Sequence, residues 1–254
     1  MSNPLNPGQL QGARILITGS SRGIGAKTAQ YLAEAGASVV INYRNKAARA
    51  EKLVEELSAT GTPALAIGAD LTDAIDVARM LNHVKEAWGG LDVLVLNASG
   101  GMEADMGEDY AMKLNRDAQV GLLMSAMGLM DRGSRVVFIT SHQAHFIREV
   151  ETMPEYLPVA LSKRAGEDAL RGMIDHMTLA GIEFVVVSGD MIEGTVTATL
   201  LNRANPGVIE QRKEQVGKLY NVDEFAAEVA LAVVEDVPVD HTRLVGDTSS
   251  FVSA

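Results

Sequence analysis

Three glycines near the start of the chain have the spacing of a turn that binds phosphate. Gly19, Gly23 and Gly25 follow the apolar run 14–18 and precede a segment with helical periodicity. Glycine permits a tight turn and lets the backbone approach a pyrophosphate, whose charge the N–H groups and dipole of the following helix attract. An ordinary glycine-rich turn is the alternative, but the strand before the glycines and the helix after them favour dinucleotide binding.

Composition restricts the other chemistry available to the chain. It has 254 residues, 47% of them hydrophobic, a net charge of −11 and no cysteine. Disulfides, thiolate catalysis and cysteine-based metal sites are therefore excluded, and the negative charge disfavours binding to nucleic acid or anionic membranes. The N-terminus lacks a signal-peptide pattern, and no apolar run approaches the roughly 20 residues that span a bilayer. We expect a cytoplasmic protein with a flexible segment at 1–12.

Short β-branched apolar runs alternate with longer segments of helical periodicity, as is typical of a parallel sheet covered by helices. The predicted strands are 14–18, 38–42, 64–69, 91–96, 134–140, 183–188 and 243–245. The predicted helices are 26–35, 46–60, 74–88, 114–130, 159–180 and 223–234. We expect one α/β domain over residues 1–254, a Rossmann-type doubly wound sheet of about seven parallel strands flanked by helices. Irregular stretches at 100–110 and 142–158 follow the carboxyl ends of strands, where such sheets bind ligands.

Residues beyond the glycine turn point to a family. The turn has the spacing Thr-Gly-x-x-x-Gly-x-Gly at 18–25, Asp70 follows the third predicted strand, and Asn-Ala-Ser-Gly at 97–100 follows the fourth. In these features the chain resembles the short-chain dehydrogenase/reductase family, and the resemblance extends over nearly all of it. The family pattern after the fourth strand is Asn-Asn-Ala-Gly, from which Leu96 and Ser99 depart. The resemblance implies that these segments line the adenine and ribose end of a nicotinamide cofactor.

The end of the second predicted strand bears on which nicotinamide cofactor binds. An acidic residue there would bind the ribose hydroxyls of NAD, but the chain has Asn42, Tyr43 and Arg44. The guanidinium groups of Arg44 and Arg22 suit a ribose 2′-phosphate. The alternative is that both are solvated loop residues with no ligand. We therefore predict NADP(H). The residues expected to contact it are Gly19, Ser21, Arg22, Gly23, Ile24, Gly25, Tyr43, Arg44, Asp70, Leu71, Asn97, Ala98, Ser99, Lys163 and Thr195.

Polar residues at the fifth strand and on the neighbouring helices match catalytic positions of the family. By resemblance, Ser141 orients the substrate oxygen and Asn115 supports a water linked to a lysine. That lysine, Lys163, holds the nicotinamide ribose and lowers the pKa of a proton-donating tyrosine. The family places this tyrosine four residues before the lysine, where the chain has Val159, which carries no proton. For Ser141, capping the strand end is the alternative role.

Tyr156, seven residues before Lys163, is the candidate replacement. Seven helical residues return to within about 20° of the same face but about 10 Å along the axis. Pro158 favours a first-turn position, so we expect Tyr156 to precede the helix, free of helical spacing. The spacing resembles the Tyr-x-x-Met-x-x-x-Lys pattern of divergent enoyl-acyl-carrier-protein reductases, whose glycine turn, however, is altered where 18–25 is standard. The alternative is a loop tyrosine that packs or binds a partner.

Further polar residues follow the fifth and sixth strands. His142 and His145 are conceivable metal ligands or alternative acids, but without an evident third ligand we expect no metal. Asp190 and Glu193 lie where the family usually has Pro-Gly, and Thr195 is placed by resemblance near the nicotinamide carboxamide.

Together these features predict an NADP(H)-dependent oxidoreductase that transfers hydride between the nicotinamide and a carbonyl/alcohol substrate, resembling 3-oxoacyl reductases. Reduction of the C=C bond of an enoyl thioester is one alternative. A non-catalytic NADP(H) sensor is another, which Val159 favours. The family resemblance also implies a homodimer or homotetramer that acts on a small molecule.

Overall fold

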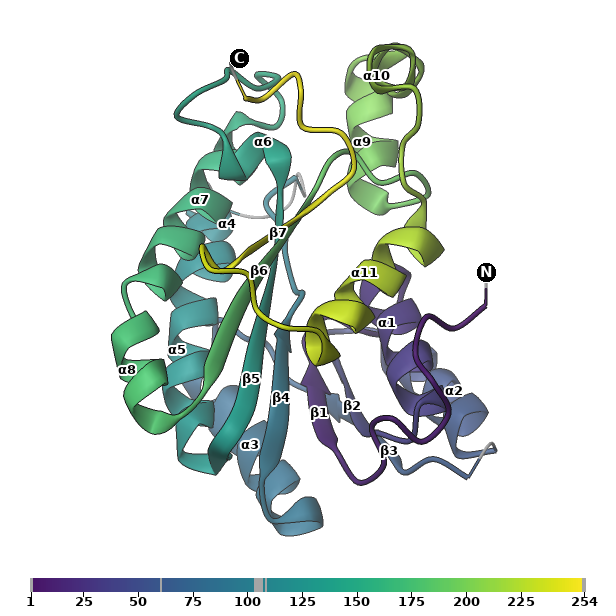
Figure 1. Ribbon diagram of the computed structural model, residues 1–254, viewed down its shortest axis with the longest axis vertical. Coiled ribbons are helices and arrows are strands. Elements are labelled where there is room, and N and C mark those ends of the chain that lie inside the picture. The colour runs from purple at the N-terminus through teal and green to yellow at the C-terminus, as the bar shows by residue number, and fades with distance from the viewer. Residues whose placement is uncertain (1, 60, 103–106, 108, 253–254) are drawn as a thin grey trace.

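Seven parallel strands form one sheet in the computed structural model, which describes residues 2–59, 61–102, 107 and 109–252. The strand order is β3-β2-β1-β4-β5-β6-β7, so the direction of winding reverses between β1 and β4 (Figure 1). The sequence prediction of a Rossmann-type sheet is confirmed, and every predicted strand is present. The strands are β1 (Arg14–Ile17), β2 (Ser38–Tyr43), β3 (Ala64–Gly68), β4 (Leu91–Leu96), β5 (Met130–Ser141), β6 (Glu183–Gly189) and β7 (Thr242–Val245).

Helices cover both faces of this sheet. The helices are α1 (Gly23–Glu34), α2 (Ala47–Ser58), α3 (Ala74–Trp88), α4 (Tyr110–Met112), α5 (Ala118–Ala126), α6 (His142–His145), α7 (Leu157–Arg171), α8 (Ile174–Ala180), α9 (Val196–Ala204), α10 (Val208–Val216) and α11 (Val222–Val234). Two further turns are π-helical, η1 (Lys113–Asp117), and 3-10, η2 (Met127–Leu129). Among the residues described, no helix is both long and apolar enough to cross a bilayer.

The two covered faces explain why the central strands are apolar at successive positions. Ile15 and Ile17 of β1 belong to the core shared with α1, α2 and α11. Leu16, between them, belongs to the core shared with α3, α5 and α8. All three side chains are fully buried, and each such burial contributes about 1.5–3 kcal/mol relative to exposure. The sheet is thereby held rigid between the two helical layers.

The sequence prediction differs from the structure where tertiary contacts decide the outcome. The predicted helix 159–180 is two helices, α7 and α8, interrupted at Gly172 and Met173. Helices α9 and α10 occupy a region where no element is predicted. Of the two irregular stretches, 100–110 includes residues 103–106 and 108, which lie outside the described residues, and 142–158 begins with α6.

The N-terminal segment 1–12 is predicted to be flexible, whereas residues 2–12 lie against α1. Leu5 is buried in the core beside α1. Asn3 donates from Nδ2 to the Tyr31 carbonyl oxygen at 2.9 Å, and the Leu10 amide donates to the Ala35 carbonyl at 2.9 Å. Two leucines, Leu5 and Leu10, five positions apart among polar, glycine and proline residues give no helix or strand periodicity, so the sequence does not signal this packing.

A close approach between η1 and α7 brings two predicted catalytic elements together. A Cβ atom at Gly166 of α7 would lie only 2.0 Å from the Asn115 carbonyl oxygen of η1. The π-helical turn itself is a form often found at functional sites. Glycine at position 166 therefore sets the spacing at which η1 can pack on α7.

We expect Gly166→Ala to lower the free energy of unfolding by about 1–3 kcal/mol or more, because the added methyl group must displace backbone. Urea denaturation followed by circular dichroism measures this change. Gly121→Ala on α5 is the matched control, because nothing lies within 4 Å of its added Cβ. In a helix that change is neutral or stabilising by roughly 0.5–1 kcal/mol. Equal stability of the two variants would contradict the close packing.

Candidate active site

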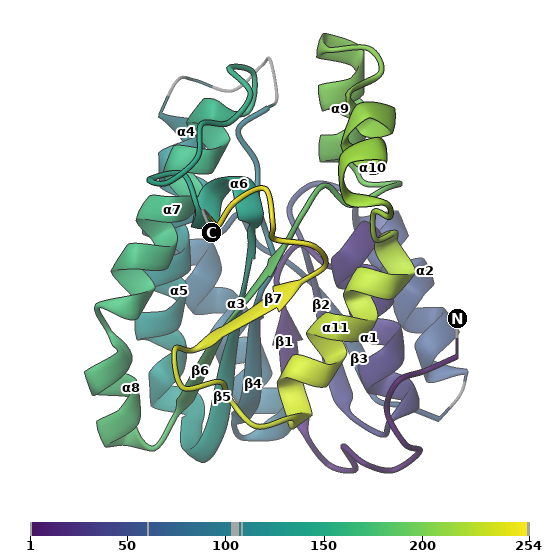
Figure 2. The ribbon, with the colours of Figure 1, turned by 45° about the horizontal axis from the view of Figure 1, so that its top comes forward.

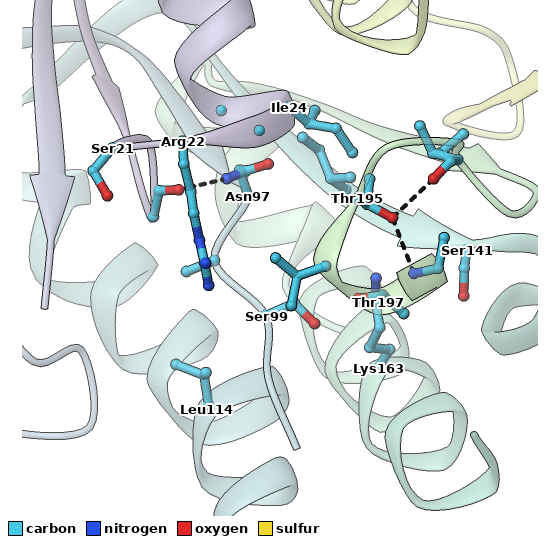
Figure 3. Close-up of a pocket in the computed structure, with 18 of the residues that line it drawn as sticks. Ser21, Arg22, Ile24, Asn97, Ser99, Leu114, Ser141, Lys163, Thr195 and Thr197 are labelled. Carbon is cyan, nitrogen blue, oxygen red and sulfur yellow. Dashed lines mark hydrogen bonds between the residues drawn. The ribbon is translucent and has the colours of Figure 1, made fainter. Parts of the chain in front are cut away.

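A pocket of about 630 Å³ opens at the carboxyl ends of the strands, where the sheet reverses its winding. It is lined by every residue predicted to contact the cofactor and by Ser141, Tyr156 and Lys163. Figure 3 shows Arg22 on one side of this pocket and Ser141 and Lys163 on the other. Asn115 does not line the pocket. Further lining residues that the sequence prediction missed include Asn45, Lys46, Arg49, Leu114, Thr140, Gln143, Met191, Ile192 and Thr197.

The turn at Gly19, Gly23 and Gly25 has a backbone conformation that depends on glycine. Gly19 and Gly23 have φ values of 62° and 59°, in the left-handed region that favours glycine. At Gly25 a Cβ atom would meet the Asn97 side chain at 2.6 Å. The Asn97 amide in turn donates from Nδ2 to the Thr18 carbonyl oxygen at 2.8 Å, which joins the end of β4 to the end of β1. These contacts fix the position of the turn and of the start of α1, both of which line the pocket.

The end of β2 carries a cluster of positive charge. Arg44, Lys46 and Arg49 line the pocket there, and Arg22 lines it from the glycine turn. The pocket-lining residues between positions 42 and 49, all of them described, include no aspartate or glutamate. Arg44 donates to the Tyr110 hydroxyl, which belongs to α4. Lys46 and Arg49 were not predicted as pocket residues. The signal that could have found them is the recurrence of basic residues at 44, 46 and 49.

Two hydroxyl groups meet on the opposite side of the pocket. The Ser141 Oγ and the Tyr156 hydroxyl oxygen lie 3.1 Å apart and share a hydrogen bond. Ser141 ends β5 and also caps α6, because its Oγ accepts from the Ala144 amide at 3.3 Å. Tyr156 immediately precedes α7, and Pro158 lies in the first turn, as the sequence predicts. Val159, at the usual tyrosine position, packs in an apolar cluster and does not line the pocket.

Burial sets the protonation of these groups. It raises the pKa of Tyr156, while the hydrogen bond with Ser141 acts in the opposite direction. Tyr156 therefore carries its proton at neutral pH. Burial also lowers the pKa of Lys163 to about 8, and the negative charge of Glu167, one helical turn further along α7, offsets part of that effect.

Asn115 joins the segment after β4 to the catalytic helix. Its Nδ2 donates to the Gly100 carbonyl oxygen and to the Ser162 Oγ, both at 2.9 Å, and its Oδ1 accepts from the Gly100 amide at 3.2 Å. Both polar atoms of the side chain are therefore hydrogen-bonded within the protein, one of them to the residue before Lys163. In the structure it holds the position of α7 next to the pocket.

The two histidines after Ser141 are engaged within the protein, and neither lines the pocket. His142 Nδ1 lies 2.8 Å from the Ser188 Oγ, and burial lowers the pKa of His142 to about 4. His145 Nδ1 lies 2.8 Å from Glu167 Oε1. Burial alone raises the pKa of Glu167, but hydrogen bonds from His145 and Arg171 outweigh it and hold that pKa below its ordinary value.

Loss of the buried charge at Lys163 is expected to stabilise the protein. The pKa is about 8 in the folded chain against an ordinary value of 10.5. Between these values the unfolded chain binds a proton that the folded chain does not, so the penalty falls as pH rises. At pH 7 we expect Lys163→Met to raise the free energy of unfolding by about 1–3 kcal/mol. The gain should shrink as pH rises from about 8 to 10.5 and be absent above that.

Urea denaturation across this pH range measures the effect, with Lys85→Met, at an exposed lysine of α3, as the control. A Lys163→Met protein no more stable than the unchanged chain at pH 7 would show that the ammonium is not strained by burial.

Comparisons with known proteins identify the family of the chain. Residues 13–205 match the family described as short chain dehydrogenase. Versicolorin reductase 1 of Dothistroma septosporum is 30% identical over 255 residues, which cover 96% of this chain and 93% of that relative.

Two solved structures share the fold over most of their length. A short chain dehydrogenase from Burkholderia cenocepacia J2315, crystallised with NADP, is 30% identical, with a TM-score of 0.75 over 89% of this chain and 91% of that one. A blue fluorescent protein from a metagenomic library, in complex with NADPH, is 28% identical, with a TM-score of 0.78 over 94% and 98%. The chain therefore belongs to the short-chain dehydrogenase/reductase family of oxidoreductases.

Proposed function

We propose that this protein is an NADP(H)-dependent reductase that converts a carbonyl group of a small molecule to an alcohol. The observation that carries the proposal is the 3.1 Å hydrogen bond between Ser141 and Tyr156, two hydroxyls that face the pocket also lined by Lys163. Such a pair suits a carbonyl oxygen, which accepts one hydrogen bond for orientation and a second that becomes a proton transfer. The reductase name of the Dothistroma relative supports the same direction of reaction.

The pocket fits the cofactor at both ends. Gly19, Gly23 and Gly25 leave room for a pyrophosphate, and the cations Arg22 and Arg44 suit a 2′-phosphate. The solved relatives crystallised with NADP and NADPH support this choice. When bound, the dinucleotide would supply the hydride, and Lys163, which lines the pocket, would hold its ribose.

The chain's own residues would perform the proton chemistry. Ser141 donates a hydrogen bond that orients the carbonyl oxygen, and Tyr156 donates the proton that oxygen needs once hydride has arrived. Tyr156 is protonated at neutral pH, and burial raises its pKa further above that pH, so it holds the proton that reduction needs. The Lys163 ammonium favours the tyrosinate left behind, by its positive charge. Asn115 keeps α7 and its lysine at the pocket through Ser162.

A sensor that binds NADP(H) without turnover is the alternative that Val159 favours. The position of Tyr156 argues against it, because a hydroxyl of the required chemistry faces the pocket although the spacing to Lys163 is unusual. Reduction of an activated C=C bond uses the same hydride donor, so the substrate panel must include an enoyl thioester. Oxidation of NADPH by ketones, with none by the enoyl thioester, is the result we expect.

Tyr156→Phe should lower kcat by about 10²–10⁴-fold, the contribution of a placed general acid. The phenyl ring keeps the packing, so NADPH affinity should stay unchanged. NADPH absorbance with an active ketone measures the rate. Tyr220→Phe, outside the pocket residues, is the matched control. Full activity of Tyr156→Phe would remove Tyr156 from the mechanism.

Arg44→Gln should weaken NADPH binding by about 10–100-fold, the worth of a hydrogen bond to a charged group. NADH, which lacks the 2′-phosphate, should bind the variant and the unchanged chain equally. Titration of cofactor fluorescence gives both dissociation constants. Arg79→Gln, on the exposed face of α3, controls for loss of one positive charge. A parallel loss of NADH affinity would refute the assignment of Arg44 to the 2′-phosphate.

A further inference from the structure

Asp190, the first residue after β6, collects hydrogen bonds from three parts of the chain. Its Oδ1 accepts from the Gln143 Nε2 at 2.9 Å and from the Met191 amide at 2.8 Å. Its Oδ2 accepts from the Arg212 Nε at 2.7 Å. The side chains of Asp190 and Arg212 are only 8% and 13% exposed, so solvent screens this ion pair weakly. Gln143 lies two residues after Ser141, and Arg212 belongs to α10.

Arg212 extends the network to the C-terminal tail, residues 246–252, which follows β7. It donates to the Ser250 Oγ at 2.8 Å, and its guanidinium carbon lies 4.8 Å from the centre of the Phe251 ring. Phe251 stacks on Phe146 at 5.6 Å and meets the edge of His142 at 5.4 Å. Figures 1 and 2 show the tail leaving β7 and passing between α9 and the region of α6. The tail is therefore held between α10 and the turn that follows Ser141.

Helix α10 has few other anchors. Of its residues, all of which are described, only Val208 is buried. The helix lies between Gly207 and Gly217, so no side chain caps either end. Val208 shares an apolar cluster with Leu201 of α9, and α9 lines the pocket from Val196 to Ala198 and at Leu201. Ile209 and Val216 of α10 pack against the same cluster but are only partly buried, so α10 buries little apolar surface and belongs to the low-stability part of the fold. Polar contacts therefore weigh heavily in where α10 and α9 lie.

We propose that Asp190 is a positioning residue which, through Arg212, holds α9, α10 and the C-terminal tail closed over the substrate side of the pocket, and through Gln143 ties them to the turn that follows Ser141. The same carboxylate thus links the covering helices to the hydroxyl that orients the substrate. Asp190 itself lines the pocket, whereas Arg212 does not, so the role acts through Arg212 and needs no contact between Asp190 and the substrate. What the proposal says about turnover rests on the proposed function, whereas what it says about closure does not.

A second ion pair between the same two segments supplies a matched control. Lys213 Nζ lies 3.1 Å from Glu193 Oε1, joining α10 to the segment after β6 as Arg212 and Asp190 do. Its side chains are 42% and 32% exposed, and neither residue lines the pocket. Lys213→Gln therefore removes a comparable charge pair without disturbing Gln143 or Phe251.

Hydrogen exchange measured by mass spectrometry on the full chain tests closure without any substrate. In Asp190→Asn and Arg212→Gln, we expect exchange in residues 196–216, 142–147 and the tail to rise about tenfold or more. Lys213→Gln should leave 142–147 and the tail unchanged. Peptides from β1 and β4 serve as the internal standard for global folding. If Asp190→Asn also loses protection there, Arg212→Gln, altered on α10 away from the sheet, decides the result. Unchanged exchange at 142–147 and the tail in Arg212→Gln would overturn the proposal.

Steady-state kinetics separates the positioning role from a merely structural one. With a ketone that the unchanged chain reduces, Arg212→Gln should raise KM for the ketone about tenfold, with kcat and NADPH affinity within about twofold. Arg212→Lys, which keeps the charge beside Asp190, should restore much of this KM. Loss of NADPH affinity with unchanged KM for the ketone would contradict the role. Absence of turnover in the unchanged chain would refute the proposed function and leave the exchange result to decide closure.

Discussion

In the proposed reaction, the hydrogen bond between Ser141 and Tyr156 determines where the acid acts in this pocket. An acid that protonates a carbonyl must lie at the oxygen while hydride reaches the carbon, so its position matters more than its place in the sequence. Ser141 is located by β5, whose last residue pairs with Gly189 of β6 in the sheet. Tyr156 precedes the first turn of α7, so the periodicity of that helix does not dictate its direction. A rigid strand end and a helix start thus bring the two hydroxyls together.

The surroundings of this hydrogen bond hold polar groups whose burial lowers stability and which the proposed reaction uses. Lys163 is buried with a lowered pKa, and Glu167 compensates it only in part from one helical turn away. The Asn115 side-chain amide donates to Gly100 and Ser162, and these bonds keep α7, which carries Lys163, beside the pocket. Natural proteins commonly accept such strained polar groups at active sites, where function requires them. The apolar packing on both faces of the sheet supplies the stability that offsets them.

The parts of the molecule that local patterns encode were predictable from the sequence. Strand periodicity, the glycine turn at 18–25 and the position of Pro158 each depend on neighbours in the chain, and each prediction agrees with the structure. Helices α9 and α10 were not predicted, because α10 buries a single side chain and has no apolar stripe. The network around Asp190 joins residues 22 to 47 positions apart through tertiary contacts alone. Such contacts leave no periodic trace in one sequence.

A crystal structure with NADP⁺ and an alcohol product or unreactive ketone analogue tests the central claim most directly. The account predicts that the Tyr156 and Ser141 hydroxyls both lie within hydrogen-bond distance of the ligand oxygen, about 2.6–3.2 Å. It also predicts that the carbon bearing that oxygen faces the nicotinamide. A complex in which the Tyr156 hydroxyl points away from the ligand, with another acid or water at its oxygen, would contradict it.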